Sequence, residues 1–400
     1  MDEYYQRKYA RLLIERGVNL HPNQLLYVET VLDAAPFAAL LAEEAFSLGA
    51  RDVIVRWDST ALDRARLRSE CSLAPNEAEQ YTNDWLIAQG AAFLRIDCPV
   101  LHALDDVAAE RLQEKSMTDR ALRYAFREKG NSQNCIACVP TKEWAAAVFP
   151  ELLPEEALEQ LWRSVLFCTY ADQEDPTACW DETYRSIVAR RSLLNAKKYR
   201  RLHLKSAITD LNVGMPEMQN WEGGGVIDET GRLFMPNLPS YEVFASPNRL
   251  EADGYVEATL PLNYQGQLIE RLRLVLSEGR VVEYSAASGE ALLGQILHED
   301  AGSSRLGEIA IVEQSSPIAR QQRIFYNVVY DENASCHMAL GKGFFRCTPE
   351  EALSQNINVS GIHVDFMFGS DDMCIRGQLP DGTWEDIMRD GTWVLTGKAP

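Results

Sequence analysis

Along the first half of the chain, the hydrophobic positions alternate between a helical period of about 3.6 residues and short apolar runs. The helical period predicts five helices: Gln6–Glu15, Ala35–Phe46, Asn76–Ala88, Asp106–Glu114 and Asp119–Glu128. The apolar runs predict four strands: Gln24–Glu29, Asp52–Trp57, Ala92–Ile96 and Cys135–Val139. Strands separated by helical segments indicate βαβ units. We therefore expect an α/β domain with a mostly parallel sheet.

The pattern changes near the middle of the chain. Two more helical patterns lead out of the first half: Glu155–Val165 and Glu182–Lys197. Beyond them, short segments predict strands: Leu202–Ser206, Gly254–Leu260, Leu268–Leu276 and Val281–Ser285. Glu278-Gly279 is a good hairpin turn, and one helix is expected at Gly289–His298. The change predicts an N-terminal α/β domain over residues 1–195 and a C-terminal α+β domain over residues 196–400.

Composition and charge narrow the range of functions. The formal net charge of −20 argues against nucleic acid as the partner, because nucleic-acid binders concentrate Lys and Arg. The N-terminus lacks the apolar core of a signal peptide, and no apolar run reaches the roughly 18–20 residues that span a bilayer. Nine scattered cysteines fit reduced thiols better than a disulfide framework. We expect a cytoplasmic protein with no membrane partner.

His363 and Asp365 form the first candidate site. They lie in GIHVDFMFG, which alternates as a strand does. Residues two apart on a strand point to the same face, so the imidazole and the carboxylate converge on one point. This pair predicts a cation site, although an HxD pair alone is a weak signal.

His337 lies in YDENASCHMALGKGF, a stretch that begins with Asp331, Glu332 and Asn333 and that we interpret as a short helix. Acidic residues at a helix N-terminus also serve as caps, so both interpretations stay open. As ligands, Glu332 and His337 would complete a metal shell. A mixed nitrogen and oxygen set favours zinc, cobalt or manganese over calcium.

Two more carboxylates lie in unusually apolar surroundings. Glu308 precedes the run Ile309–Val312, and Glu242 lies in MPNLPSYEVFASP, between prolines. A buried carboxylate is costly unless it is paired or holds a metal. An ion pair with Arg305 is the alternative for Glu308. Two neighbouring metals need a bridging carboxylate, and Glu308 is the best-buried candidate.

These stretches resemble the aminopeptidase T, aminopeptidase S and PepS family of dinuclear metallo-aminopeptidases. The matching segments are PNLPSYEVFASP, RLGEIAIVEQSSPI, FYNVVYDENASCHMALG and HVDFMFGS. The resemblance implies an exopeptidase that acts on peptides with a free N-terminus, a homodimer, and an N-terminal α/β domain beside a catalytic domain. It also implies two divalent metal ions per chain (zinc, cobalt, manganese or magnesium), with Glu308 bridging them. The implied metal ligands are Glu242, Glu308, Glu332, His337, His363 and Asp365.

The expected reaction is hydrolysis of the first peptide bond by a water that the two metals activate. A carboxylate must take the proton of this water and return it to the leaving amine, and Glu308 and Glu332 are the candidates. The alternatives are a non-catalytic or weakly active peptide-binding relative that kept the metal site, and a dinuclear metal amidohydrolase.

One position departs from the family. The members that this sequence resembles carry a tyrosine near the metals, seven residues after the histidine equivalent to His337, and this chain has Phe344 there. The hydroxyl is absent, so any stabilisation that it gives the transition state must come from another group. Tyr326 and Tyr330 are the nearest candidates in the sequence.

Overall fold

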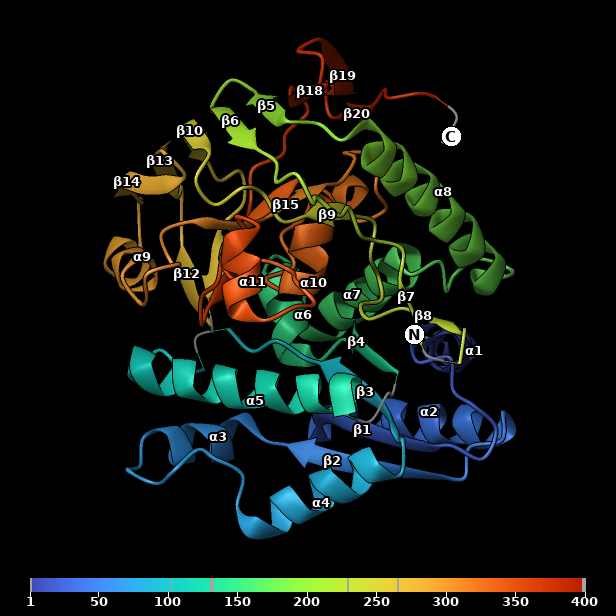
Figure 1. Ribbon diagram of the computed structural model, residues 1–400. Coiled ribbons are helices and arrows are strands. Elements are labelled where there is room, and N and C mark those ends of the chain that lie inside the picture. The colour runs from blue at the N-terminus through green and yellow to red at the C-terminus, as the bar shows by residue number, and fades with distance from the viewer. Residues whose placement is uncertain (1, 102, 130–132, 229, 265, 398–400) are drawn as a thin grey trace. The chain divides into compact units, whose positions relative to one another are not determined.

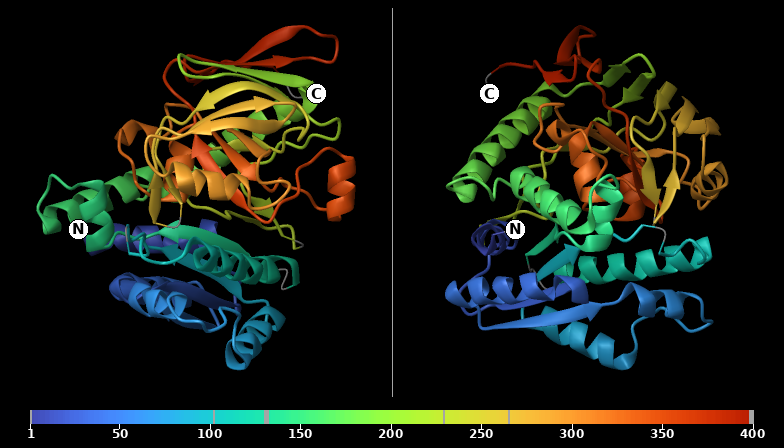
Figure 2. Two further views of the ribbon diagram at one scale, coloured as in Figure 1. Left: turned by 90° about the vertical axis from the view of Figure 1, so that its left-hand side faces the viewer. Right: turned by 180° about the vertical axis from the view of Figure 1, so that it is seen from behind.

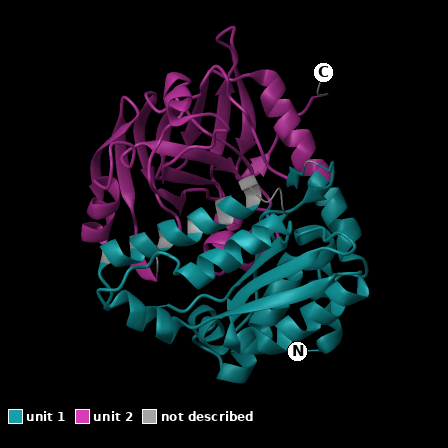
Figure 3. Ribbon diagram, turned by 60° about the horizontal axis from the view of Figure 1, so that its bottom comes forward, with its two compact units in different colours: residues 1–184, 225–240 teal, residues 185–224, 241–400 magenta. Residues whose placement is uncertain are grey.

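The computed structural model describes residues 2–101, 103–129, 133–228, 230–264 and 266–397. The chain divides into two compact units (Figure 3). The first unit comprises Met1–Tyr184 and Gly225–Ser240, and the second comprises Arg185–Gly224 and Tyr241–Pro400. The chain thus leaves the first unit after Tyr184, returns to it for residues 225–240 and leaves it again.

The first unit contains a four-stranded sheet in the order β2-β1-β3-β4, and every neighbouring pair is parallel. Its strands are β1 (Leu25–Val31), β2 (Asp52–Asp58), β3 (Ala92–Asp97) and β4 (Asn134–Cys138). This confirms the parallel sheet that the sequence predicts. Within residues 225–240, Asn237 forms a parallel bridge with Ile136 of β4, so this segment extends the same sheet.

Helices accompany this sheet (Figures 1 and 2). They are α1 (Glu3–Leu12), α2 (Ala35–Ser47), α3 (Thr60–Leu67), α4 (Glu77–Ala88), α5 (Ala109–Lys129), α6 (Lys142–Val148) and α7 (Pro154–Cys168). Helix α8 (Pro176–Lys197) begins in the first unit and continues into the second, which starts at Arg185. The two helices expected at Asp106–Glu114 and Asp119–Glu128 are one continuous helix, α5, because residues 115–118 contain no glycine or proline to break it. Among the described residues, none of the helices is both long enough and apolar enough to cross a membrane.

The second unit is built mainly from two antiparallel sheets. The larger has the order β14-β13-β10-β6-β5-β18-β19-β20. Its strands are β5 (Arg201–Lys205), β6 (Asp210–Gly214), β10 (Ala252–Glu257), β13 (Arg273–Ser277), β14 (Arg280–Ser285), β18 (Cys374–Gln378), β19 (Trp384–Arg389) and β20 (Thr392–Trp393). The expected strand Leu268–Leu276 is two strands, β12 (Gln267–Ile269) and β13, because the backbone turns at Arg271, whose φ is 50°. The expected helix at Gly289–His298 is α9 (Glu290–Leu297).

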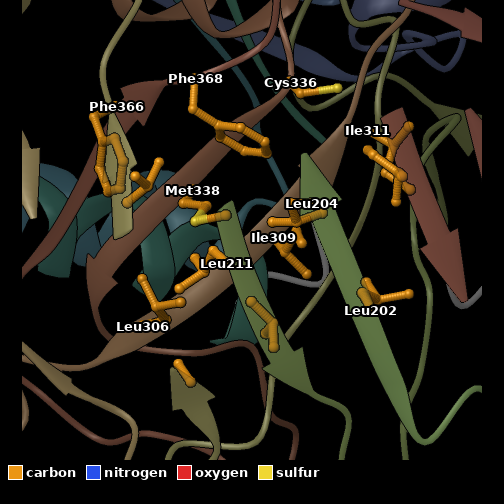
Figure 4. Close-up of a cluster of buried hydrophobic side chains, with 14 of the residues drawn as sticks. Leu202, Leu204, Leu211, Leu306, Ile309, Ile311, Cys336, Met338, Phe366 and Phe368 are labelled. Atoms are coloured by element: carbon orange, nitrogen blue, oxygen red, sulfur yellow. The ribbon is translucent and has the colours of Figure 1, made fainter. Parts of the chain in front are cut away.

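The smaller sheet has the order β17-β16-β15-β9. Its strands are β9 (Val243–Ala245), β15 (Leu306–Ile311), β16 (His337–Gly341) and β17 (His363–Met367). One face of this sheet joins the larger sheet in a common core, where Ile309, Met338 and Phe366 lie in one buried cluster with Leu202 and Leu211 (Figure 4). Because side chains alternate across a strand, the residues between these apolar positions point to the opposite face.

Candidate metal centre

The face of the smaller sheet that points away from the core carries most of the predicted site. Glu308 lies on β15, His337 begins β16, and His363 and Asp365 lie on β17. Glu242 directly precedes β9. The apolar neighbours of these residues lie in the core, so the alternation of the strands separates core from site.

A β-bulge gives Glu308 its direction. Leu306 pairs with Leu340, whereas Glu308 pairs with Ala339, so Gly307 is the extra residue of β15. Without the bulge, Leu306 and Glu308 would share a face, and Glu308 would point into the core. A Cβ atom on Gly307 would lie 2.4 Å from the carbonyl oxygens of Gly341 and Lys342, so only glycine fits there.

The side chain that lies on β16 between Glu308 and Asp365 is short. Ala339 on the central strand β16 pairs with Glu308 on one side and with Asp365 on the other. Its methyl group is fully buried between the two carboxylate-bearing strands. The short side chain leaves room above the sheet for ions between Glu308 and Asp365.

Glu332 reaches the site from the 3₁₀ turn Glu332–Ala334, which follows α10 (Val328–Asp331). The interpretation of His337 as part of a short helix is wrong. Ser335 is extended, with φ −157° and ψ 156°, and this ends the helical turn before β16 begins. His337 therefore follows the alternation of a strand.

The structure brings all six predicted residues together. Their donor atoms form three groups in which every atom lies within 4.8 Å of the others. The groups are Glu242 with Glu308 and His337, Glu308 with His363 and Asp365, and Glu332 with His337 and Asp365. The first two groups share only Glu308.

Glu308 directs its two carboxylate oxygens toward different histidines. Its Oε1 lies 3.7 Å from Nε2 of His337, and its Oε2 lies 3.1 Å from Nε2 of His363. Each histidine also has its own carboxylate, since Nε2 of His337 is 3.0 Å from Glu242 and Nε2 of His363 is 3.3 Å from Asp365. The alternative pairing of Glu308 with Arg305 is not formed, because Arg305 donates to the carbonyl of Arg249 at 2.6 Å.

Backbone carbonyls fix the orientation of both rings. Nδ1 of His363 is 2.7 Å from the carbonyl oxygen of Lys342, and Nδ1 of His337 is 3.3 Å from that of Ser335. A carbonyl can only accept, so each Nδ1 carries the proton and donates it. This arrangement, which is common among metal-binding histidines, leaves Nε2 to face the carboxylates.

Burial makes the charge balance of the site unusual. Glu242, Glu308, Glu332 and His337 are buried, and four carboxylates face only two histidines. Burial raises the pKa of Glu332 well above its ordinary value, and the neighbouring Glu242 and Asp365 raise it further. Burial opposes protonation of His337, but the neighbouring carboxylates of Glu242 and Glu308 raise its pKa well above the ordinary value. Such a cluster carries more negative charge than the histidines can balance, and divalent cations would balance it.

Asp331 and Asn333 hold the turn rather than enter the donor groups. The carboxylate of Asp331 accepts hydrogen bonds from the N–H groups of Phe325 and Asn327 at 2.8 and 3.0 Å. Asn333 accepts a hydrogen bond from the N–H of Tyr241 at 2.6 Å and donates to the carbonyl of Val329. Asn333 thus ties the segment before Glu242 to the turn that carries Glu332.

Comparison with known proteins identifies the family. Residues 3–393 match the thermophilic metalloprotease (M29) family. The chain belongs to the M29 metalloprotease family. It is 36% identical to aminopeptidase 2 of Geobacillus stearothermophilus and 34% identical to aminopeptidase PepS of Streptococcus thermophilus, over 97% of each chain in both cases. The solved structure of wild-type AmpT from Thermus thermophilus is similar with a TM-score of 0.88 and 33% identity, and covers 98% of this chain and 100% of that one.

Phe344 lies beside the donor cluster of this M29 chain. Its ring packs edge-on against His363, with the ring centroids 5.3 Å apart, and contacts Phe244 at 4.8 Å. Phe344 is 41% exposed. Tyr330, by contrast, is fully buried and packs against Phe325.

Several further residues shape this site and were not predicted from the sequence. Phe244 follows Glu242 by two residues in the same extended segment, so the alternation of β9 was a usable signal for it. Gly307 and Ala339 act through the register of the sheet, which depends on strands far apart in the sequence. The carbonyl of Lys342 acts through its backbone, and no side-chain pattern reveals it.

Proposed function

We propose that this protein is a metal-dependent aminopeptidase that removes the N-terminal residue from peptides, with its catalytic domain in residues 196–400. The observation that carries this proposal is the shared position of Glu308 between two donor groups, in a chain of the M29 metalloprotease family. A carboxylate that offers one oxygen to each of two histidine-containing groups is suited to bridge two cations.

Five of the six donors would hold the two ions. Glu242 and His337 would hold one ion, His363 and Asp365 would hold the other, and Glu308 would bridge them. Bound cations would supply Lewis-acid activation of the attacking water and of the scissile carbonyl. Glu332 belongs to a third group that includes ligands from both sides, so it is well placed to take the proton of the water and return it to the leaving amine. Glu308 is the second candidate for this transfer.

The metal identity, the number of ions, the location and the oligomeric state are part of the same proposal. Imidazole and carboxylate ligands suit zinc, cobalt, manganese or magnesium, and we propose two such ions per chain. We also propose a cytoplasmic homodimer that acts on peptides with a free N-terminus. Size-exclusion chromatography with light scattering would test the dimer, and a monomeric mass at the working concentration would contradict it.

Paired peptides test the activity. We expect the metal-loaded protein to release the first amino acid from a short peptide, and N-acetylation of that peptide to lower the rate by orders of magnitude, because the free amine is lost. Released amino acids are measured by chromatography. Equal cleavage of the free and acetylated peptides would instead indicate an endopeptidase or an amidohydrolase, and tight binding without cleavage would indicate a non-catalytic relative.

A further inference from the structure

An apolar hollow opens beside the metal centre within the second unit. Its enclosed part measures about 30 Å³, and its mouth is open to solvent. Its apolar lining comes from Pro216, Met218, Phe244, Ala245, Phe344 and Ile357. We propose that this hollow binds the side chain of the substrate's first residue and selects uncharged, apolar residues. This inference rests on the proposed aminopeptidase function.

The hollow shares two walls with the donor cluster. Phe344 contacts the ring of His363 on one side and Phe244 on the other, with centroid distances of 5.3 and 4.8 Å. Phe244 lies two residues after Glu242, on the same side of β9. These two rings therefore place a wall of the hollow next to ligands from both donor groups.

The more exposed donors of the cluster lie on β17, the strand that carries the neighbour of Phe344, His363. The side chains of His363 and Asp365 are 22% and 12% exposed, whereas that of Glu308 is 5% exposed. A substrate thus reaches the ions from the side of β17, where the partly exposed Phe344 also lies. In an aminopeptidase substrate, the Cα atom of the first residue is bonded to both the amine and the scissile carbonyl carbon. The side chain of this first residue therefore lies close to the metal ligands and to the wall of the hollow that contacts them.

The charge at the rim favours an uncharged side chain. The carboxylate of Glu222 lies 3.5 Å from Arg346 and accepts a hydrogen bond from Asn220 at 2.8 Å. The acid and the base offset each other, so neither a cationic nor an anionic side chain gains an unmatched partner there. Apolar walls with a few polar groups at the edge are typical of sites that bind apolar groups.

The walls are held in place by backbone hydrogen bonds. Glu222 and Phe244 exchange two such bonds, at 2.8 and 3.0 Å. The N–H of Phe344 donates to Oγ of Ser246 at 2.7 Å, and the N–H of Gly343 donates to the carbonyl of Asn358 at 2.9 Å. The two phenylalanines are thus positioned before substrate arrives, which lowers the cost of binding.

The test compares substrates that differ only in the first residue. Leucine, alanine and glycine p-nitroanilides share a leaving group, so their kcat/KM values report the first side chain alone. We expect leucine to exceed alanine by about tenfold or more, the range for filling an apolar pocket. Phe344→Ala should lower this ratio by about tenfold, and Phe344→Tyr, which keeps the ring, should preserve the preference. Met218→Ala, at a 71% exposed position, provides a second variant with little risk to folding.

Tyr284→Ala is the matched control, because Tyr284 is an aromatic residue of similar exposure (38%) on β14. It should change neither the rate nor the ratio. Calorimetric binding of leucine hydroxamate and glycine hydroxamate gives a readout that is independent of turnover, and Phe344→Ala should weaken only the preference for leucine. A ratio that is unchanged in both hollow variants, or a preference that follows the second residue of Ala-Xaa dipeptides, would overturn the inference. Failure of the native protein to hydrolyse any of these substrates would overturn the proposed function. Binding of the two hydroxamates alone would then test whether the hollow prefers a leucine side chain.

Discussion

At the scale of single residues, the chemistry of the site depends on how Glu308 is shared. Its two oxygens face His337 and His363, which belong to different donor groups. The other carboxylates in these two groups, Glu242 and Asp365, each lie near one histidine. Loss of Glu308 would therefore weaken both ions at once, whereas loss of Glu242 or Asp365 would weaken mainly one.

Glu308→Gln tests this role. The substitution keeps the size of the side chain but removes its charge, so we expect fewer than two ions per chain and a loss of activity. Substitution of a residue that merely supports a metal ligand lowers metal affinity or activity about 10–100-fold. Loss of the ligand itself should therefore lower the activity by at least about 100-fold. Metal analysis and peptide hydrolysis measure both effects. Glu283→Gln, at an exposed position of β14, should change neither. Full metal content in Glu308→Gln would reduce Glu308 to an ordinary buried carboxylate.

Phe344→Tyr tests the position where the chain departs from the family it resembles. A hydroxyl on this partly exposed ring next to His363 has room, and it can donate to the oxyanion that forms during hydrolysis. One donor of this kind is worth about 10²–10³ in kcat, so we expect turnover to rise by up to that factor. The rate on one peptide is compared at equal metal content. A flat or lower rate in the folded, metallated variant would place the oxyanion donor elsewhere.

At the scale of elements, strand alternation explains which part of the site was predictable. The HxD pair of His363 and Asp365 needs only period-two alternation, and the structure places both on β17 as expected. The strand carrying Glu308 was also predictable from Ile309–Val312. The direction of Glu308 was not, because it depends on the bulge at Gly307. For His337, the acidic stretch before it suggested a helix, but the extended Ser335 ends the helical turn and β16 begins at His337.

Gly307→Ala tests the bulge. The added methyl group would lie 2.4 Å from the carbonyl oxygen of Lys342, which accepts the hydrogen bond from His363. Relief of this overlap moves either Glu308 or His363, so we expect a stability loss of about 1–3 kcal/mol and weaker metal binding. Gly361→Ala is the matched control, since its methyl group would meet only Asp300, at an ordinary 3.4 Å. Thermal unfolding and metal content distinguish the two variants, and equal behaviour would contradict the role of the bulge.

At the scale of the whole molecule, the sequence predicts the parallel sheet and the β-rich second half, because both follow from local periodicity. It does not predict the return of residues 225–240 to the first unit, where Asn237 bridges to Ile136. That pairing joins segments about a hundred residues apart and leaves no local pattern. The six donors likewise come from three strands, the segment before β9 and a 3₁₀ turn, so their association came from the family resemblance rather than from spacing. The M29 family match then supports the same chemistry.

The most direct test of the account is a metal titration of the chelated protein. Zinc, cobalt or manganese is added in steps, and bound ions per chain and release of the N-terminal amino acid are measured on the same samples. We expect negligible hydrolysis without metal, because four carboxylates and two histidines cannot activate water as two cations do. Activity should rise with occupancy and level off near two ions per chain. Hydrolysis at the full rate by the metal-free protein would contradict the account.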